Sequence, residues 1–94
     1  MKFDLLLAQK LLAPHVAAYR AFSYSELTEK ILRGDVDTFE TNVSGVLYRF
    51  EFKFFWHDEP YNHIYVTGSV YTDAMGASVK EEFILSSSGR FVGE

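Results

Sequence analysis

Residues 46–57 alternate along their whole length between two kinds of side chain. The even positions are all apolar or aromatic: Val46, Tyr48, Phe50, Phe52, Phe54 and Trp56. The odd positions carry the charges of the segment: Leu47, Arg49, Glu51, Lys53, Phe55 and His57. Successive side chains of a β-strand point to opposite faces of its sheet. The segment is therefore predicted to be a long strand of an antiparallel sheet, with one face on a core and the other in solvent.

The neighbouring turns predict how this strand pairs. Ser44 and Gly45 suit a two-residue hairpin on one side, and Pro60 with Asn62 forms the turn of the loop 57–63 on the other. The expected pairs on the apolar face are Val43 with Val46, Thr41 with Tyr48, Phe39 with Phe50, Trp56 with Ile64, Phe54 with Val66, Phe52 with Gly68, and Phe50 with Val70. A turn at 73–77 leads to a fourth strand at 79–85, and a turn at 86–89 precedes a fifth fragment at 90–92.

The first third of the chain has helical periodicity instead. Leu5, Ala8 and Leu12 share one face of a helix that is predicted to begin at about Asp4, and Pro14 is expected to kink it or to open a new turn.

A second helix is marked at both ends. Ser23 and Glu26 have the spacing of a capping box, and Gly34 supplies a left-handed stop. Its predicted buried stripe is Leu27, Ile31 and Tyr24.

Helices at about 4–33 followed by strands at about 37–92 predict the α+β class in a single domain, 1–94. We expect two N-terminal helices packed on one face of a four-stranded antiparallel meander sheet. A strongly curved sheet of this kind would be similar in architecture to the cystatin-like or NTF2-like half-cone, although no motif carries that likeness.

Composition excludes several function classes. The chain has no cysteine, which removes disulfides, thiolate catalysis and cysteine-based metal sites. Its net charge is −4 with charges interspersed, so no basic stripe for a nucleic acid is present. The apolar run at 5–8 is far shorter than the ~20 residues of a membrane span. We expect a cytoplasmic protein with no cofactor, no nucleic-acid partner and no membrane partner.

A first candidate site is a pocket on the apolar face. Alternation places Glu81 on that face opposite Gly68, where a missing side chain leaves room for a carboxylate. A half-buried carboxylate could anchor a ligand or act as a general acid or base. The walls would be Tyr48, Phe52, Trp56 and Phe83. The alternative is that the helices leave this end of the strand uncovered and Glu81 lies in solvent.

A second candidate is a metal site at the hairpin loop. His57 and His63 would face each other across its mouth, with Asp58 and Glu59 nearby. The spacing matches no established motif, and a solvated charged loop is the alternative.

The third candidate is the polar face of the sheet, which is more apolar at one end than solvent requires. Phe55 is predicted to oppose Tyr65, Arg49 to oppose Tyr71, and Ile84 to lie near Tyr65. Exposed apolar patches often mark an interface, frequently with a second copy.

These observations favour a small non-enzymatic binding protein that self-associates through its sheet, most simply as a homodimer, with an unknown protein as a further partner. Compact acidic accessory proteins of bacteria, such as immunity or antitoxin factors, have this character. The runner-up is a pocket protein or minor enzyme with Glu81 as its polar anchor.

Overall fold

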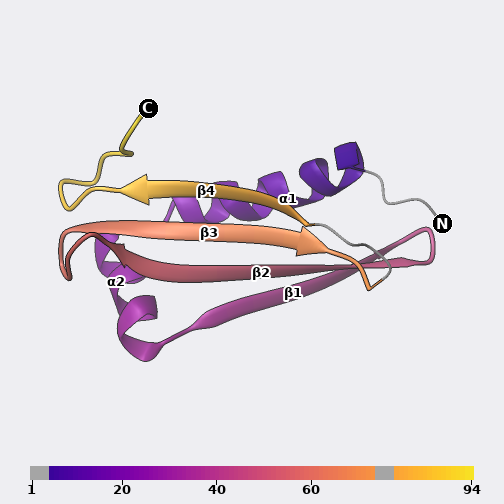
Figure 1. Ribbon diagram of the computed structural model, residues 1–94, viewed down its shortest axis with the longest axis horizontal. Coiled ribbons are helices and arrows are strands. Elements are labelled where there is room, and N and C mark those ends of the chain that lie inside the picture. Colours follow the sequence, from indigo (N-terminus) through magenta and orange to yellow (C-terminus); the bar gives the residue numbers. More distant parts are fainter. Residues whose placement is uncertain (1–4, 74–77) are drawn as a thin grey trace.

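The computed structural model describes residues 5–73 and 78–94 (Figure 1). The helices α1 (Leu5–Arg20) and α2 (Tyr24–Arg33) precede four strands, β1 (Val36–Val43), β2 (Val46–His57), β3 (His63–Tyr71) and β4 (Val79–Leu85). The strands form one antiparallel sheet in the order β1-β2-β3-β4. The predicted α+β class is confirmed. The helix start expected at Asp4 and most of the turn expected at 73–77 lie outside the described residues.

α1 continues through Pro14 to Arg20 as one helix, so the new turn that was one of the two expectations at Pro14 is wrong. Proline cannot donate the helical hydrogen bond to the carbonyl of Lys10. Pro14 lies on the exposed side of the helix, where solvent can satisfy that carbonyl. The opposite side is buried along the full length of the helix, at Ala8, Leu12, Val16 and Tyr19. Burial of this stripe holds the helix together across the missing bond.

α2 begins and ends as its sequence predicts. Ser23 Oγ accepts a hydrogen bond from the backbone N–H of Glu26, and the Glu26 carboxylate accepts one from the backbone N–H of Ser23. Gly34 adopts the left-handed conformation, with φ 70°, and ends the helix. Leu27 is fully buried, and Tyr24 and Ile31 are partly buried against the core.

The predicted strand register is confirmed. Ser44 and Gly45 both have positive φ, 53° and 82°, which the tight hairpin between β1 and β2 requires. All seven expected apolar-face pairs are present, together with Arg49–Tyr71, Phe55–Tyr65 and Tyr65–Ile84 on the other face.

The two helices cover one face of the sheet unevenly. α1 packs on β3 and β4 and α2 packs on β2 and β3, as Figure 1 shows. The core lies between these layers and is rich in aromatic rings, with Phe50 and Phe52 fully buried. β1 has no fully buried residue, and Phe39 remains 38% exposed although the His15 ring stacks on it at 4.8 Å.

The chain end folds back onto the sheet edge. Phe91 forms a bridge with Leu85, and the Val92 N–H donates to the Ile84 carbonyl at 2.8 Å. Arg20, at the end of α1, stacks its guanidinium over the Phe91 ring at 4.0 Å and pairs with Glu94. The predicted fifth fragment is therefore an isolated bridge that protects the edge of β4.

Neither described helix has the length and apolar character needed to span a membrane.

Candidate functional site

The sheet face that points away from α1 and α2 is the main surface that no described helix covers. We call it the outer face. On β2, β3 and β4 it consists of Leu47, Arg49, Glu51, Lys53, Phe55, His57, His63, Tyr65, Thr67, Ser69, Tyr71, Lys80, Glu82 and Ile84. None of these side chains is fully buried. The outer face is thus available for a partner over three neighbouring strands.

Charges on the outer face are arranged in two adjacent rows that cross the strands. In one row, Glu51 of β2 pairs with Ser69 of β3, which pairs with Lys80 of β4. In the next row, Lys53 pairs with Thr67, which pairs with Glu82. The glutamate is therefore on β2 in the first row and on β4 in the second, and in each row the lysine is on the other of these two strands. We call this square of Glu51, Lys53, Lys80 and Glu82 the charge square.

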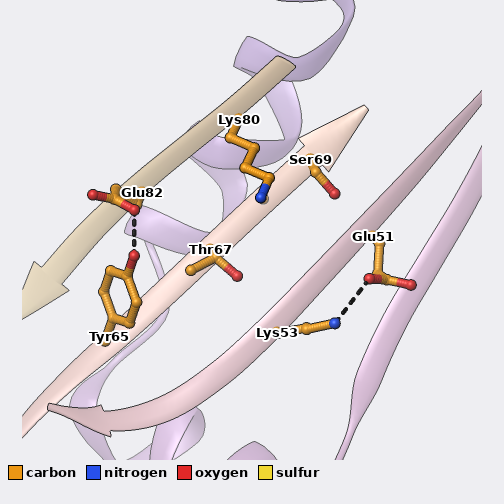
Figure 2. Close-up of a pocket in the computed structure, with 8 residues that line it drawn as sticks. Glu51, Lys53, Tyr65, Thr67, Ser69, Lys80 and Glu82 are labelled. Atoms are coloured by element: carbon orange, nitrogen blue, oxygen red, sulfur yellow. Dashed lines mark hydrogen bonds and ion pairs between the residues drawn. The ribbon is translucent and has the colours of Figure 1, made fainter. Parts of the chain in front are cut away.

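Figure 2 shows these residues around a shallow hollow of about 210 Å³ on the outer face. Lys53 Nζ lies 3.3 Å from a Glu51 carboxylate oxygen. The Tyr65 hydroxyl donates a hydrogen bond to Glu82, and this bond, followed by partial burial, raises the pKa of Tyr65. Lys80 Nζ has no hydrogen bond or ion pair with any residue that the structure describes. One positive charge of the square is therefore without a partner among residues 5–73 and 78–94.

Beyond the charge square, one end of the outer face is apolar. Phe55 is 46% exposed, and its ring centroid lies 6.3 Å from that of Tyr65. Ile84 follows in the same row on β4. Phe55, Tyr65 and Ile84 were predicted to lie together on this face, and the structure brings them together.

Tyr71, the remaining predicted interface residue, lies at the opposite end of the outer face. It borders a second hollow of about 340 Å³, together with Arg49, Glu40 and Thr38. Arg49 lies 3.6 Å from Glu40 and 3.4 Å from Asp73. This end is charged where the Phe55 end is apolar.

His57 and His63 face each other across the hairpin mouth as predicted. Their rings are nearly parallel, with centroids 6.4 Å apart, and His57 Nδ1 lies 3.3 Å from an Asp58 oxygen. Among residues 5–73 and 78–94, no three histidine or carboxylate side chains converge as a metal site would need.

Glu81 is paired with Gly68 as predicted, but the space at the glycine is already filled. A Cβ built on Gly68 would lie 2.3 Å from Cε2 of Phe52, so the Phe52 ring occupies the room that the pocket hypothesis assigned to the Glu81 carboxylate. Glu81 is exposed, on the edge strand, and its charge acts on Arg20. The half-buried carboxylate of the pocket hypothesis is therefore wrong, and the alternative reading, in which Glu81 lies in solvent, agrees with the structure.

The expected pocket walls belong to the core instead. Tyr48, Phe52 and Phe83 are buried, and Trp56 is partly buried against Tyr61, with ring centroids 4.9 Å apart. Neither described hollow is lined by any of these four residues.

One polar cluster on the helix-covered face was missed in the sequence analysis. Asp37 of β1 accepts hydrogen bonds from the Tyr19 hydroxyl of α1 and, at 2.7 Å, from Lys30 Nζ of α2. Lys30 Nζ also lies 5.3 Å from the centre of the Phe54 ring. The cluster joins both helices to β1.

Burial and charge in this cluster shift the pKa values of Tyr19 and Asp37 in directions that favour the hydrogen bond between them. Burial, with the nearby Asp37 carboxylate, raises the pKa of Tyr19 and keeps its hydroxyl a donor. Partial burial alone would raise the pKa of Asp37, but the hydrogen bonds from Lys30 and Tyr19 outweigh it, and the net effect lowers that pKa. The short spacing between Lys30 and Asp37 was the only sequence signal of this contact, and it did not reveal the position of α1.

Comparisons with protein-family models, with curated proteins and with solved structures each found no match.

Proposed function

We propose that this protein is a small non-enzymatic interaction protein that pairs with a second copy of itself through the outer face. The observation that carries the proposal is the apolar end of that face, where Phe55 is half exposed beside Tyr65 and Ile84. A large aromatic ring left in water on an uncovered sheet is stabilised when a partner covers it.

The form of the outer face supports a protein partner rather than a small molecule. Its two described hollows are open to solvent, and about half or more of the lining surface of each is polar, whereas small-molecule sites are enclosed and mostly apolar. A net charge of −4 also disfavours a nucleic acid. The proposal includes a cytoplasmic location, since a chain without cysteine has no need of an oxidising compartment.

Light scattering coupled to size exclusion tests the proposal. Wild-type protein at micromolar concentration should have the mass of a dimer, and Tyr65→Glu should have the mass of a monomer, because it places a charge in the apolar end of the interface.

The matched control is Tyr61→Glu. It makes the same change at a 64% exposed tyrosine of the 57–63 loop, whose ring packs against Trp56 of the helix-covered face, and should remain dimeric. A wild-type monomer throughout the concentration range would overturn self-association and would direct the search to a foreign protein.

A further inference from the structure

The charge square restricts how a second copy can sit on the outer face. Sheets that pack face to face lie about 10 Å apart, a gap that a lysine and a glutamate reaching from opposite sides can bridge. Like charges brought together across such a gap cost several-fold to many-fold in affinity. Only an arrangement that sets each acid of the square over a base is therefore compatible with a tight dimer.

Two two-fold axes through the centre of the square meet this condition. A lengthwise axis, parallel to β3, places β2 of one copy over β4 of the other. Glu51 then faces the second copy's Lys80, and Lys53 faces its Glu82. A crosswise axis, perpendicular to the strands, instead places Glu51 over the second copy's Lys53. A diagonal axis sets two like charges against each other.

The rest of the outer face distinguishes the two. The lengthwise axis places Phe55 over the second copy's Ile84, and Tyr65 over its counterpart, so apolar surface meets apolar surface. The crosswise axis places Phe55 over the second copy's Arg49. It would bury a guanidinium that lies near carboxylates on its own chain.

We infer that the dimer forms about the lengthwise axis, with Lys80 bound by Glu51 of the second copy. The inference rests on the proposed self-association and specifies its geometry. It gives the unpaired Lys80 a partner, and it places Gly68 and its neighbours in β3 nearest the axis. The twist of about −30° between packed sheets displaces residues near the axis least, so the charge square keeps its partners.

Mixing two single variants tests this geometry. Glu51→Lys alone sets lysine against Lys80, and Lys80→Glu alone sets glutamate against Glu51. Each should raise the dimer dissociation constant at least about tenfold at 0.15 M salt. In an equimolar mixture the two chains are complementary at every contact of the lengthwise dimer. The mixture should therefore recover a dissociation constant close to that of wild type, measured by sedimentation equilibrium.

The crosswise dimer predicts a different result. There the mixture of Glu51→Lys with Lys80→Glu keeps two like-charge contacts and stays weak, whereas Glu51→Lys with Lys53→Glu recovers. That second result would overturn the lengthwise axis and leave self-association standing. Recovery can come only from folded chains, which separates an interface effect from misfolding.

The control for the charge change is Glu29→Lys, at an exposed position of α2 that should leave the dissociation constant unchanged at the same salt concentration. Single variants that dimerise as well as wild type would also overturn the inference, because the charge square would then lie outside the interface. A wild-type monomer would mean that the proposed function has failed as well.

Discussion

At the scale of single residues, Gly68 has the most restricted position in the sheet. Its backbone borders the hollow of the outer face, while the side from which a Cβ would project is occupied by the Phe52 ring. Phe52 is only 1% exposed, so its ring cannot turn away from Gly68 into solvent without leaving the core. The pairing of the large Phe52 with the small Gly68 therefore fills the core on one face of β3, while the hollow lies on the other face.

Gly68→Ala should destabilise the protein by about 1–3 kcal/mol, the usual cost of overpacking a filled core. Most Gly→Ala changes in a strand lower the entropy of the unfolded chain and stabilise slightly. Here the 2.3 Å approach to Phe52 outweighs that gain. Urea unfolding followed by fluorescence measures the change, and Ser69→Ala, on the open face next to it, should stay within about 0.5 kcal/mol of wild type.

The cause can be checked by a second substitution. Phe52→Leu alone should destabilise by leaving a cavity, whereas the double variant Gly68→Ala with Phe52→Leu should lose less than the sum of the two single losses. Simple additivity would mean that the methyl group and the ring do not compete for the same space.

At the scale of secondary-structure elements, the contact of Tyr19 and Lys30 with Asp37 joins α1, α2 and β1. β1 has no fully buried residue, so apolar packing attaches it less firmly than the other strands. A partly buried carboxylate with two donors from different helices compensates for this. The cluster is therefore expected to hold the β1 edge of the sheet against the helix layer.

Asp37→Asn should cost about 1–3 kcal/mol at neutral pH, because it removes the nearer of the two carboxylates that pair with Lys30 and leaves Asp35 at 4.0 Å. The folded state lowers the pKa of Asp37 below the value of about 3.9 that an unfolded chain has, so the unfolded state binds the proton more readily. The contribution of the carboxylate is thus complete above that value and is lost as pH falls through the folded pKa.

Unfolding measured between pH 7 and pH 2 should show wild type and Asp37→Asn converging as the solution becomes acidic. The control is Glu40→Gln on the exposed side of β1, whose pair with Arg49 should contribute less than about 1 kcal/mol. A gap between wild type and Asp37→Asn that stays constant with pH would show that the side chain acts by shape rather than by charge.

The elements also explain which features could be predicted from the sequence. The sheet register followed from alternation over β2 and from tight turn residues at its start, and each is a local property. The continuation of α1 past Pro14 and the Asp37 cluster depend on which helix covers which strand. Local patterns do not contain that information, because it arises when the layers pack. Glu81 is a further example: its pairing with Gly68 could be predicted from alternation, but its exposure to solvent depends on where the helices lie.

At the scale of the whole molecule, the net charge of −4 opposes the self-association that we propose for the outer face. In the proposed dimer, two copies would repel each other over the whole molecule, whose longest dimension is 44 Å, whereas the facing charge squares would attract at close range. Salt screens the two forces differently. The Debye length falls from about 30 Å at 0.01 M salt to about 8 Å at 0.15 M, so long-range repulsion weakens far more than contacts within a dry interface.

Raising salt from 0.01 M to 0.15 M should therefore lower the dimer dissociation constant several-fold, as measured by sedimentation equilibrium. Glu29→Lys, which reduces the net charge from −4 to −2, should show a shallower dependence, because it removes repulsion without touching the outer face. A dissociation constant that rises steadily with salt would instead mean that the Glu–Lys contacts, rather than burial of Phe55 and Tyr65, supply most of the attraction. The sign of the salt effect thus separates the two contributions that the outer face combines.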